Sequence, residues 1–507
     1  MSPKSHTRAI RGKMALAVLA TVGVVSGGLA IGSRNDAPPP VGGNVANLWV
    51  NTSAGGSPSR CSSPCAYVAA NAFGSYDAAY QAASNGDKIC VNTGSYGGQQ
   101  IQYKAAITAE VTIDGDCNGT SRTNVNVTQT TIGQANGSAQ TRFVTMKDMS
   151  LNGAASVQAV FIYYGSNGAS KLSDMADHIT FDNVNICYER ATTGPCFEAY
   201  STDAVTVKNS TIGPACCGLN SGGVETNSPV GIRFGADTVT GGGFPVNSGL
   251  VIHNNLIQGI YTDCSKWLTG HGSCPQATCT DALDLCHNDG IQIWGASDMT
   301  ITNNRIYHVG INGIFLDSTA LMTNGTIANN MIGDILPDPR NGFGENCFDI
   351  DGRGILGTWQ IINNTCDPGD VFGLSWAQTM DTNNAVWNLK GNLGTISLAT
   401  TASDPNGCTA GTTGVFVYSY NTLSPDDGQD RANGCGGNET TGPATFVDGT
   451  SVAPTNTMNL ALSGANGPAD NKIPPATCAG FVTADIDGVS RPQDTNCEAG
   501  AWERAQP

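Results

Sequence analysis

Charged and aromatic side chains are scarce in this chain of 507 residues, at 13% and 7% of the sequence. Long amphipathic helical patterns are also absent, and the clearest helical stretch covers only residues 76–83, which excludes a helical bundle. No Gly-rich phosphate-binding loop, Ser–His–Asp arrangement or zinc motif stands out. These absences argue against nucleotide-binding, serine-hydrolase and zinc-dependent chemistry.

Basic residues are in the minority: 24 Lys and Arg face 41 Asp and Glu, so the net charge is −17. Such a field repels phosphate backbones and anionic membranes, and nucleic acid is therefore not an expected partner. An acidic polysaccharide would be repelled too, unless Ca²⁺ or local Arg residues intervene.

Residues 1–30 have the pattern of an export signal, in which a basic segment precedes a small, apolar run that ends in small residues. The basic residues are Lys4, Arg8, Arg11 and Lys13. An uncleaved membrane anchor is the alternative. Residues 31–60, which include three consecutive prolines, are expected to form a linker, and no second membrane-spanning run follows. We therefore expect a secreted protein, with association with the cell surface left open.

The cysteines number 18, and many follow one another closely along the chain. In an exported protein this pattern predicts disulfides. A zinc site is the alternative only near the first pair, where no His accompanies the cysteines. The close pairs are Cys61/Cys65, Cys187/Cys196, Cys264/Cys274, Cys279/Cys286, Cys347/Cys366, Cys408/Cys435 and Cys478/Cys497. Spacing does not fix the connectivity, and the adjacent Cys216 and Cys217 are expected to pair with other residues.

A short pattern recurs along the central chain: an apolar residue, any residue, Asn, two further residues and Ile, with Cys in place of Ile in the last copy. Its first Asn falls at positions 183, 209, 254, 303, 329 and 363, and the Asn is doubled in four copies. The intervals between these positions are 26, 45, 49, 26 and 34 residues. The repeated value of 26 indicates a base period with insertions, as stacked coils have. The Asn side chains are expected to form a ladder, with turn chemistry as the alternative.

A second set of short apolar strands alternates with the first, so a coil carries at least two strands. These strands are predicted at residues 231–234, 290–293, 313–316, 347–350 and 373–376. A short strand cannot bury its apolar side alone, but coils stacked about 4.8 Å apart pair their backbone groups with the coils above and below. The sequence therefore predicts an all-β, single-stranded parallel β-helix with an apolar interior.

Insertions and ends complete the predicted organisation. Two long loops rich in Gly and Cys, at 213–229 and 261–286, are expected to be locked by disulfides and to wall a functional groove. The helical stretch 76–83 would cap the N-terminal mouth. We expect a β-helix domain over 61–407, followed at 408–507 by C-terminal coils and a capping tail, in a monomer.

Three segments resemble known β-helix proteins. Residues 77–101, which contain Gly-Asp-Lys-Ile-Cys-Val-Asn-Thr-Gly-Ser-Tyr, resemble the beginning of pectate-lyase-like β-helices. Residues 287–292 (His-Asn-Asp-Gly-Ile-Gln) resemble a strand common in bacterial right-handed β-helix proteins. Residues 485–503 resemble the C-terminal signature of choice-of-anchor surface proteins. The resemblance covers roughly residues 65–505. It implies a right-handed, pectin-lyase-like β-helix whose usual ligand is carbohydrate, in lyases, hydrolases, epimerases and non-catalytic proteins alike.

The predicted strands can be aligned on their interior residues, which places the outward residues in files across successive coils. The aligned interior residues are Ile232, Ile291, Ile314, Phe348 and Leu374. One outward file then reads Arg233, Gln292, Phe315, Asp349 and Ser375. The next file reads Gly235, Trp294, Asp317, Asp351 and Ala377.

These files contain the candidate ligand-binding residues. Asp317, Asp349 and Asp351 would lie close enough to share a cation, and Ca²⁺ suits several carboxylates. The sugar-binding candidates are Trp294, Gln292 and Arg233. A turn in which Arg353 is the salt-bridge partner of the acids is the alternative. The base of a lyase could be Arg353, Arg233, His287 or His308.

A second catalytic candidate is Asp289, because Asn288-Asp289-Gly290 partly matches the Asn-Thr-Asp-Gly motif of polygalacturonases, whose Asp is catalytic. The Asp pair that those enzymes carry on the next coil is replaced here by Gly-Ile-Asn-Gly at 310–313, and a polar turn is the alternative. We predict a secreted β-helix protein that binds a polysaccharide, with cleavage by a lyase or hydrolase mechanism left open. The alternative is a non-catalytic surface or adhesion protein. The glycan and the bond are not determined by the sequence.

Overall fold

The computed structural model describes residues 45–501 with internal gaps, of which the longest are 164–174, 218–229, 236–246, 262–287, 336–345, 375–384, 399–414, 424–439 and 449–458. Strands dominate the described part, and its two α-helices are the short α1 (Tyr76–Ala82) and α2 (Pro475–Cys478). No helix within these described ranges is long and apolar enough to cross a membrane. The predicted export signal and most of the predicted linker lie outside them.

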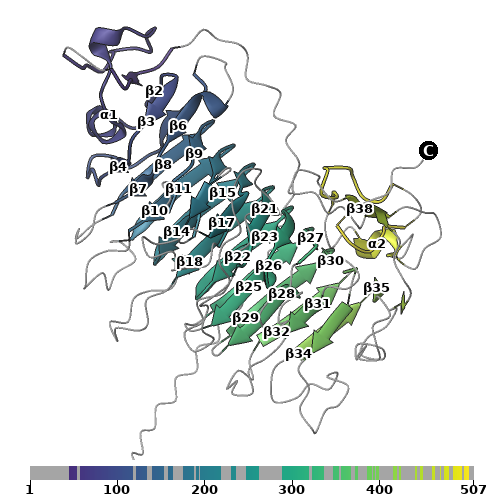
Figure 1. Cartoon of the computed structure of the whole chain (residues 1–507). Coiled ribbons are helices and arrows are strands. Elements are labelled where there is room, and N and C mark those ends of the chain that lie inside the picture. Colours follow the sequence, from purple (N-terminus) through teal and green to yellow (C-terminus); the bar gives the residue numbers. More distant parts are fainter. Residues whose placement is uncertain are drawn as a thin grey trace, which may run out of the picture.

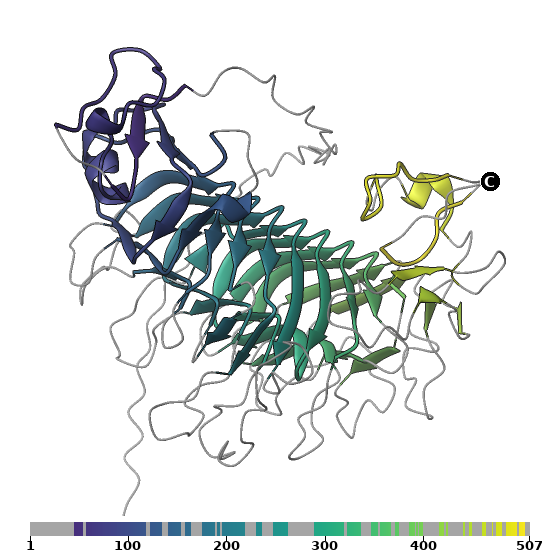
Figure 2. The ribbon, with the colours of Figure 1, turned by 45° about the horizontal axis from the view of Figure 1, so that its top comes forward.

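Three long parallel sheets form the body of the molecule (Figure 1). A 13-stranded sheet runs from β1 (Leu48–Val50) to β34 (Val415–Ser419), and an 11-stranded sheet includes β3 (Gly94–Tyr96) and β30 (Thr365–Cys366). Each strand pairs in parallel with strands of the neighbouring coils, which Figure 2 shows as arrows stacked along one axis. The fold is a right-handed parallel β-helix, so the predicted fold class is confirmed.

The third sheet has ten strands and carries the candidate site. Its strands are β4 (Gln99–Ile101), β7 (Thr130–Ile132), β10 (Val160–Ile162), β14 (Phe197–Tyr200), β18 (Ile232–Gly235), β22 (Ile291–Ile293), β25 (Asn312–Ser318), β28 (Asn346–Gly352), β31 (Val371–Leu374) and β33 (Thr395–Leu398). Its inward residues, such as Ile232, Phe234 and Ile291, belong to one continuous buried core. The alternating residues therefore face outward.

The recurring Asn pattern bridges two strands of each coil. In one coil Ile301 ends up in β23 (Ala296–Thr302), the Asn pair forms the turn, and Ile306 lies in β24 (Arg305–Val309). Both Ile side chains are buried in the core. The complete coil has three strands, because this turn joins the 13-stranded sheet to the 11-stranded sheet and the ten-stranded sheet follows.

The predicted Asn ladder is present, and its continuous part is formed by the second Asn of the four pairs together with Asn392, which follows Gly391. Each side-chain amide donates to the Oδ1 atom of the next at 2.9–3.0 Å, and each also donates to a backbone carbonyl. The members are Asn255, Asn304, Asn330, Asn364 and Asn392. All five are at most 3% exposed, so the ladder satisfies buried backbone groups at every turn.

Helix α1 covers the N-terminal end of the core, as predicted. Ser75 caps it by accepting a hydrogen bond from the Ala78 N–H, and Tyr76 and Tyr80 are completely buried against the interior. The helix ends at Ala82, one residue before the predicted end. Strand β1 lies within the residues expected to be linker, because the apolar run at 48–50 pairs with β2 (Lys88–Val91) and starts the first coil.

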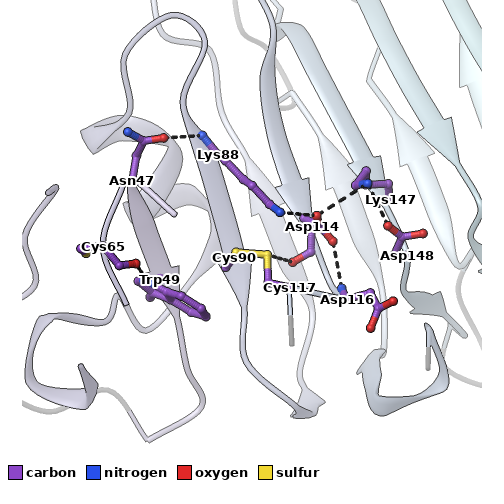
Figure 3. Close-up of a disulfide and its surroundings, with 10 residues drawn as sticks. All are labelled: Asn47, Trp49, Cys65, Lys88, Cys90, Asp114, Asp116, Cys117, Lys147 and Asp148. Atoms are coloured by element: carbon purple, nitrogen blue, oxygen red, sulfur yellow. Dashed lines mark hydrogen bonds and ion pairs between the residues drawn. A yellow bond between two sulfur atoms is a disulfide. The ribbon is translucent and has the colours of Figure 1, made fainter. Parts of the chain in front are cut away.

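A disulfide and a buried ion pair join the first coils (Figure 3). Cys90 of β2 is bonded to Cys117, with the Cα atoms 5.6 Å apart. Beside it, Asp114 is 3% exposed and its Oδ2 lies 2.9 Å from Lys88 Nζ and 3.6 Å from Lys147 Nζ. Burial would lower the pKa of Lys147, but Asp114 and Asp148 outweigh this and raise it. The cluster therefore links three successive strands of the 13-stranded sheet.

The other described disulfides bear out the prediction of an oxidised protein. Four of the close pairs seen in the sequence are bonded to each other, namely Cys61–Cys65, Cys187–Cys196, Cys347–Cys366 and Cys478–Cys497. The bond between Cys90 and Cys117, across a separation of 27, was not among the predicted close pairs. No cysteine among the residues described is free. The remaining predicted pairs lie outside the described residues.

The C-terminal segment packs beside the 11-stranded sheet (yellow in Figure 2). Ile486 and Ala501 form a buried cluster with Tyr307 and Met331 of the coils. Buried Arg491 donates to the backbone carbonyls of Glu498 and Gly500 and to the Asn329 side chain. The described residues of the segment 485–501 thus attach the tail to the side of the coils.

Candidate functional site

The register of the ten-stranded sheet confirms most of the predicted alignment. Ile232 pairs with Ile291, Ile291 with Ile314, and Ile314 with Phe348. The last step was wrong by two residues, because Phe348 pairs with Phe372 rather than with Leu374. One residue of this difference arises at the register irregularity between Asn346 and Phe348. A difference of two residues preserves the alternation of strand residues, so the sequence pattern could not distinguish the predicted register from the observed one.

The outward file therefore contains Arg233, Gln292, Phe315 and Asp349 on neighbouring coils, as predicted, but Asp349 pairs with Gly373. Ser375 and Ala377 lie outside the described residues. The second file brings Asp317 opposite Asp351 in the backbone register, one coil apart. These pairings fix where the backbone places the predicted site residues.

Arg233 is the centre of a polar cluster on this outward face. Its Nε donates to Gln292 Oε1 at 2.9 Å, and its Nη1 lies 3.4 Å from Glu198 Oε1. Its Cζ lies 4.9 Å from the centroid of the Trp294 ring, which is a cation–π distance. Arg233 thus contacts both of the other sugar-binding candidates, Gln292 and Trp294.

Sequence reasoning missed Glu198, which holds Arg233 in place. The residue is 4% exposed, and its carboxylate accepts from Gln158 Nε2 at 2.5 Å and from the Tyr200 hydroxyl at 2.7 Å. Burial, and then the neighbouring Glu198, raises the pKa of Tyr200, so the phenol stays protonated and donates to the carboxylate. This strand was not recognised in the sequence, although its alternation of apolar residues and its likeness to the predicted strand at 347–350, which also begins Cys-Phe, were usable signals.

Asp289 lies at a buried corner between two sheets. It is 0% exposed, and its Oδ1 accepts from the Asn312 amide at 3.0 Å; Asn346 in turn donates to Asn312 at 3.1 Å. The Gly310 N–H is close to the carbonyls of both Ile260 and Asn288. This geometry matches the polar-turn alternative, and a catalytic role of Asp289 stays a prediction.

The remaining candidates can be placed only in part. His287 and Arg353 lie outside the described residues. His308 is completely buried, and its Nδ1 contacts the Asp334 carboxylate. Asp349 is partly buried, whereas the side chains of Asp317 and Asp351 are not among those described. No group of three or more His, Cys, Asp or Glu within the described part is arranged to hold a metal ion.

Neither a protein-family model nor a curated protein sequence matches the chain. Several solved structures are similar to it. A pectate lyase, Pel9A, shows 13% identity over 90% of this chain and 97% of its own, with a TM-score of 0.46. The A-module of the Azotobacter vinelandii mannuronan C-5 epimerase AlgE6 shows 15% identity over 73% and 94%, with a TM-score of 0.35. The PL6 family alginate lyase AlyGC shows 12% identity over 85% and 58%, with a TM-score of 0.34.

Proposed function

We propose that this is an extracellular protein that binds a polysaccharide on the outward face of the ten-stranded sheet. The observation that supports the proposal is the Arg233 guanidinium, fixed by Glu198 and Gln292 and stacked on Trp294. A planar aromatic ring beside fixed hydrogen-bonding groups is the arrangement by which proteins hold a sugar. The disulfides agree with an oxidising compartment.

Cleavage of the bound glycan is the second part of the proposal. A lyase would need a base next to the sugar carboxylate, and a hydrolase would need a proton donor at the glycosidic oxygen. The predicted catalytic residues Asp289, His287 and Arg353 remain candidates; of these the structure describes Asp289, whose side chain is completely buried. Carboxylates Asp317, Asp349 and Asp351 are proposed to bind Ca²⁺ at the C-terminal end of the face.

A screen of the purified protein against uronate-containing and neutral glycans tests binding and cleavage together. We expect saturable binding, with unsaturated products detected by ultraviolet absorbance for a lyase, or released reducing ends for a hydrolase. Trp294→Ala should weaken binding by about tenfold, as loss of an aromatic anchor does. Phe143→Ala is the matched control, since Phe143 is a half-buried ring on the 13-stranded sheet. Unchanged binding by Trp294→Ala would contradict the proposed site.

The alternative is a non-catalytic protein of the cell surface. The resemblance of residues 485–503 to a surface-protein signature favours it, although Arg491 and Gly500 of that segment make contacts within the fold. Fractionation of the producing cells distinguishes the readings: recovery from the cell wall, with binding but no products in the glycan screen, would favour the surface protein.

A further inference from the structure

Three partly exposed aromatic rings extend the Arg233–Trp294 cluster toward the N-terminal coils. Phe161 lies on β10 in the same outward file as Glu198, with which it pairs in the register. Its ring centroid is 4.7 Å from that of Tyr163 and 6.4 Å from that of Tyr200. Phe161 and Tyr200 lie in strands of the ten-stranded sheet, Tyr163 directly follows β10, and the side chains of all three are partly exposed. We call Phe161, Tyr163 and Tyr200 the aromatic platform.

The platform and Trp294 belong to one strip along the helix axis. Tyr200 pairs with Gly235, and its ring fills the space above that glycine: a Cβ built there would lie 2.1 Å from Tyr200 Cε1. Phe234 pairs with Ile293 on the next coil. The residues that follow them, Gly235 and Trp294, therefore lie opposite each other, and Trp294 is the next member of the file. From β10 to β22 the strip spans three coil spacings, about 14 Å. A glycan chain running parallel to the axis could therefore place successive sugar rings on successive coils.

Charge on this face argues against carboxylate-bearing sugars. Arg233 is the sole basic residue among the described members of the two outward files between β10 and β28, and Glu198 already neutralises it. Asp349 follows in the same file, and the chain as a whole carries a net charge of −17. A uronate on the platform would lose water without gaining a cation, which is unfavourable. An uncharged sugar can stack its apolar face on the rings without that penalty.

We infer that the aromatic platform binds neutral sugar residues of a glycan that lies along the helix axis, so the ligand is an uncharged polysaccharide or a polymer with uncharged segments. This inference rests on the proposed function and specifies its substrate class. The carboxylates of β25 and β28 lie beyond Trp294, at the other end of the strip. Binding of neutral sugars to the platform is therefore independent of Ca²⁺.

The test compares the binding of neutral gluco-, manno- and xylo-oligosaccharides with that of oligogalacturonate and oligomannuronate of equal length, by titration calorimetry with the full protein. We expect at least one neutral series to bind at least tenfold more tightly than the uronates, with no change on adding EDTA. Tyr163→Ala combined with Phe161→Ala should lower that affinity at least tenfold, whereas Phe143→Ala should not. Tyr163→Leu, which keeps the bulk of the side chain but removes the ring, serves if the double variant does not fold.

The outcomes separate the two proposals. Preferential binding of uronates, or unchanged binding of neutral oligosaccharides by the folded platform variants, would overturn the inference and leave the proposed function intact if Trp294→Ala still weakens binding. Absence of binding to both classes would overturn the proposed function itself, and the inference with it.

Discussion

The two residues of each Asn–Asn pair have different structural tasks. The first residue adopts a left-handed backbone conformation, with φ between 51° and 60° at Asn254, Asn303, Asn329 and Asn363. Asn tolerates this region better than most residues. The second residue points inward and forms the buried ladder. Both readings of the repeated Asn, turn chemistry and ladder, are therefore correct, each for one member of the pair.

Asn330→Ala should be strongly destabilising because Asn330 is an interior member of the ladder. It accepts from the backbone and side-chain amides of Asn304, and it donates to the Ile301 carbonyl and to Asn364. Its loss leaves several buried polar groups without partners, at about 1–3 kcal/mol each. Denaturant unfolding measures the effect. Asn254→Gly, at a first position with φ 52°, should change the stability by less than about 1 kcal/mol. Similar effects of the two variants would contradict the division of tasks.

At the scale of elements, the first turn of the β-helix depends on an ion pair. Arg60 donates to both carboxylate oxygens of Asp87, at 2.6 and 2.7 Å, and the Ser84 N–H donates to Oδ2. Burial would raise the pKa of Asp87, but the Arg60 and Ser84 hydrogen bonds outweigh it, and the pKa lies below its usual value. This pair fastens the residues after α1 to the N-terminal segment.

Because the pKa of Asp87 is lowered in the folded protein, the stability of the N-terminal end of the β-helix depends on pH. The stabilisation is complete above the unfolded-state pKa of about 4 and declines as the pH falls toward the lower folded value. Asp87→Asn should therefore cost about 1–2 kcal/mol near neutral pH, and the difference from the native protein should shrink at about pH 3. Thermal unfolding at both pH values measures this. Glu110→Gln, at an exposed acid nearby, should show little effect at either pH. A constant difference for Asp87→Asn would refute the linkage.

The proposed Ca²⁺ site belongs to two adjacent elements, β25 and β28, whose register pairs Asp317 with Asp351. Ca²⁺ should bind in the weak range of extracellular modules, about 10⁻⁴ to 10⁻³ M, and should raise the melting temperature by mass action. Asp351→Asn should abolish that rise. Asp298→Asn, at an exposed acid of the 13-stranded sheet, should retain it. If Ca²⁺ leaves the native melting temperature unchanged at millimolar concentration, the site does not exist.

At the scale of the whole molecule, disulfides join neighbouring strands and coils, and the tail connects parts that are distant in sequence. Cys90–Cys117 joins β2 to the residues that follow β5 (Val111–Asp114) on the next coil, and Cys347–Cys366 joins β28 of the ten-stranded sheet to β30 of the 11-stranded sheet. The tail adds an ion pair between Asp487 and Arg305. A solenoid has contacts only between neighbouring coils, so covalent links between neighbours and the long-range contact of the tail both matter for global unfolding.

Reduction of the disulfides should lower the melting temperature markedly. The individual bonds should differ according to the loop that each closes, because a longer loop loses more entropy in the unfolded chain. Replacing Cys90 and Cys117 by Ala, across a separation of 27, should cost about 3–4 kcal/mol. Replacing Cys61 and Cys65, across a separation of 4, should cost less. Calorimetric unfolding of the two double variants tests the order, and the reverse order would contradict it.

The sequence by itself determined the coil repeat, the inward or outward direction of most strand residues, the capping helix and the presence of disulfides, because these depend on composition and local spacing; it left the disulfide connectivity open. Only the tertiary structure decided which residues of successive coils lie opposite one another. Loops of unequal length conceal that Phe161, Glu198 and Arg233 share one file. Phe348 pairs with Phe372, two residues before the predicted partner Leu374, and a difference of two leaves the alternation intact. Pairing between coils is a non-local choice, so the cluster around Arg233 could be predicted in part, and its anchoring carboxylate could not.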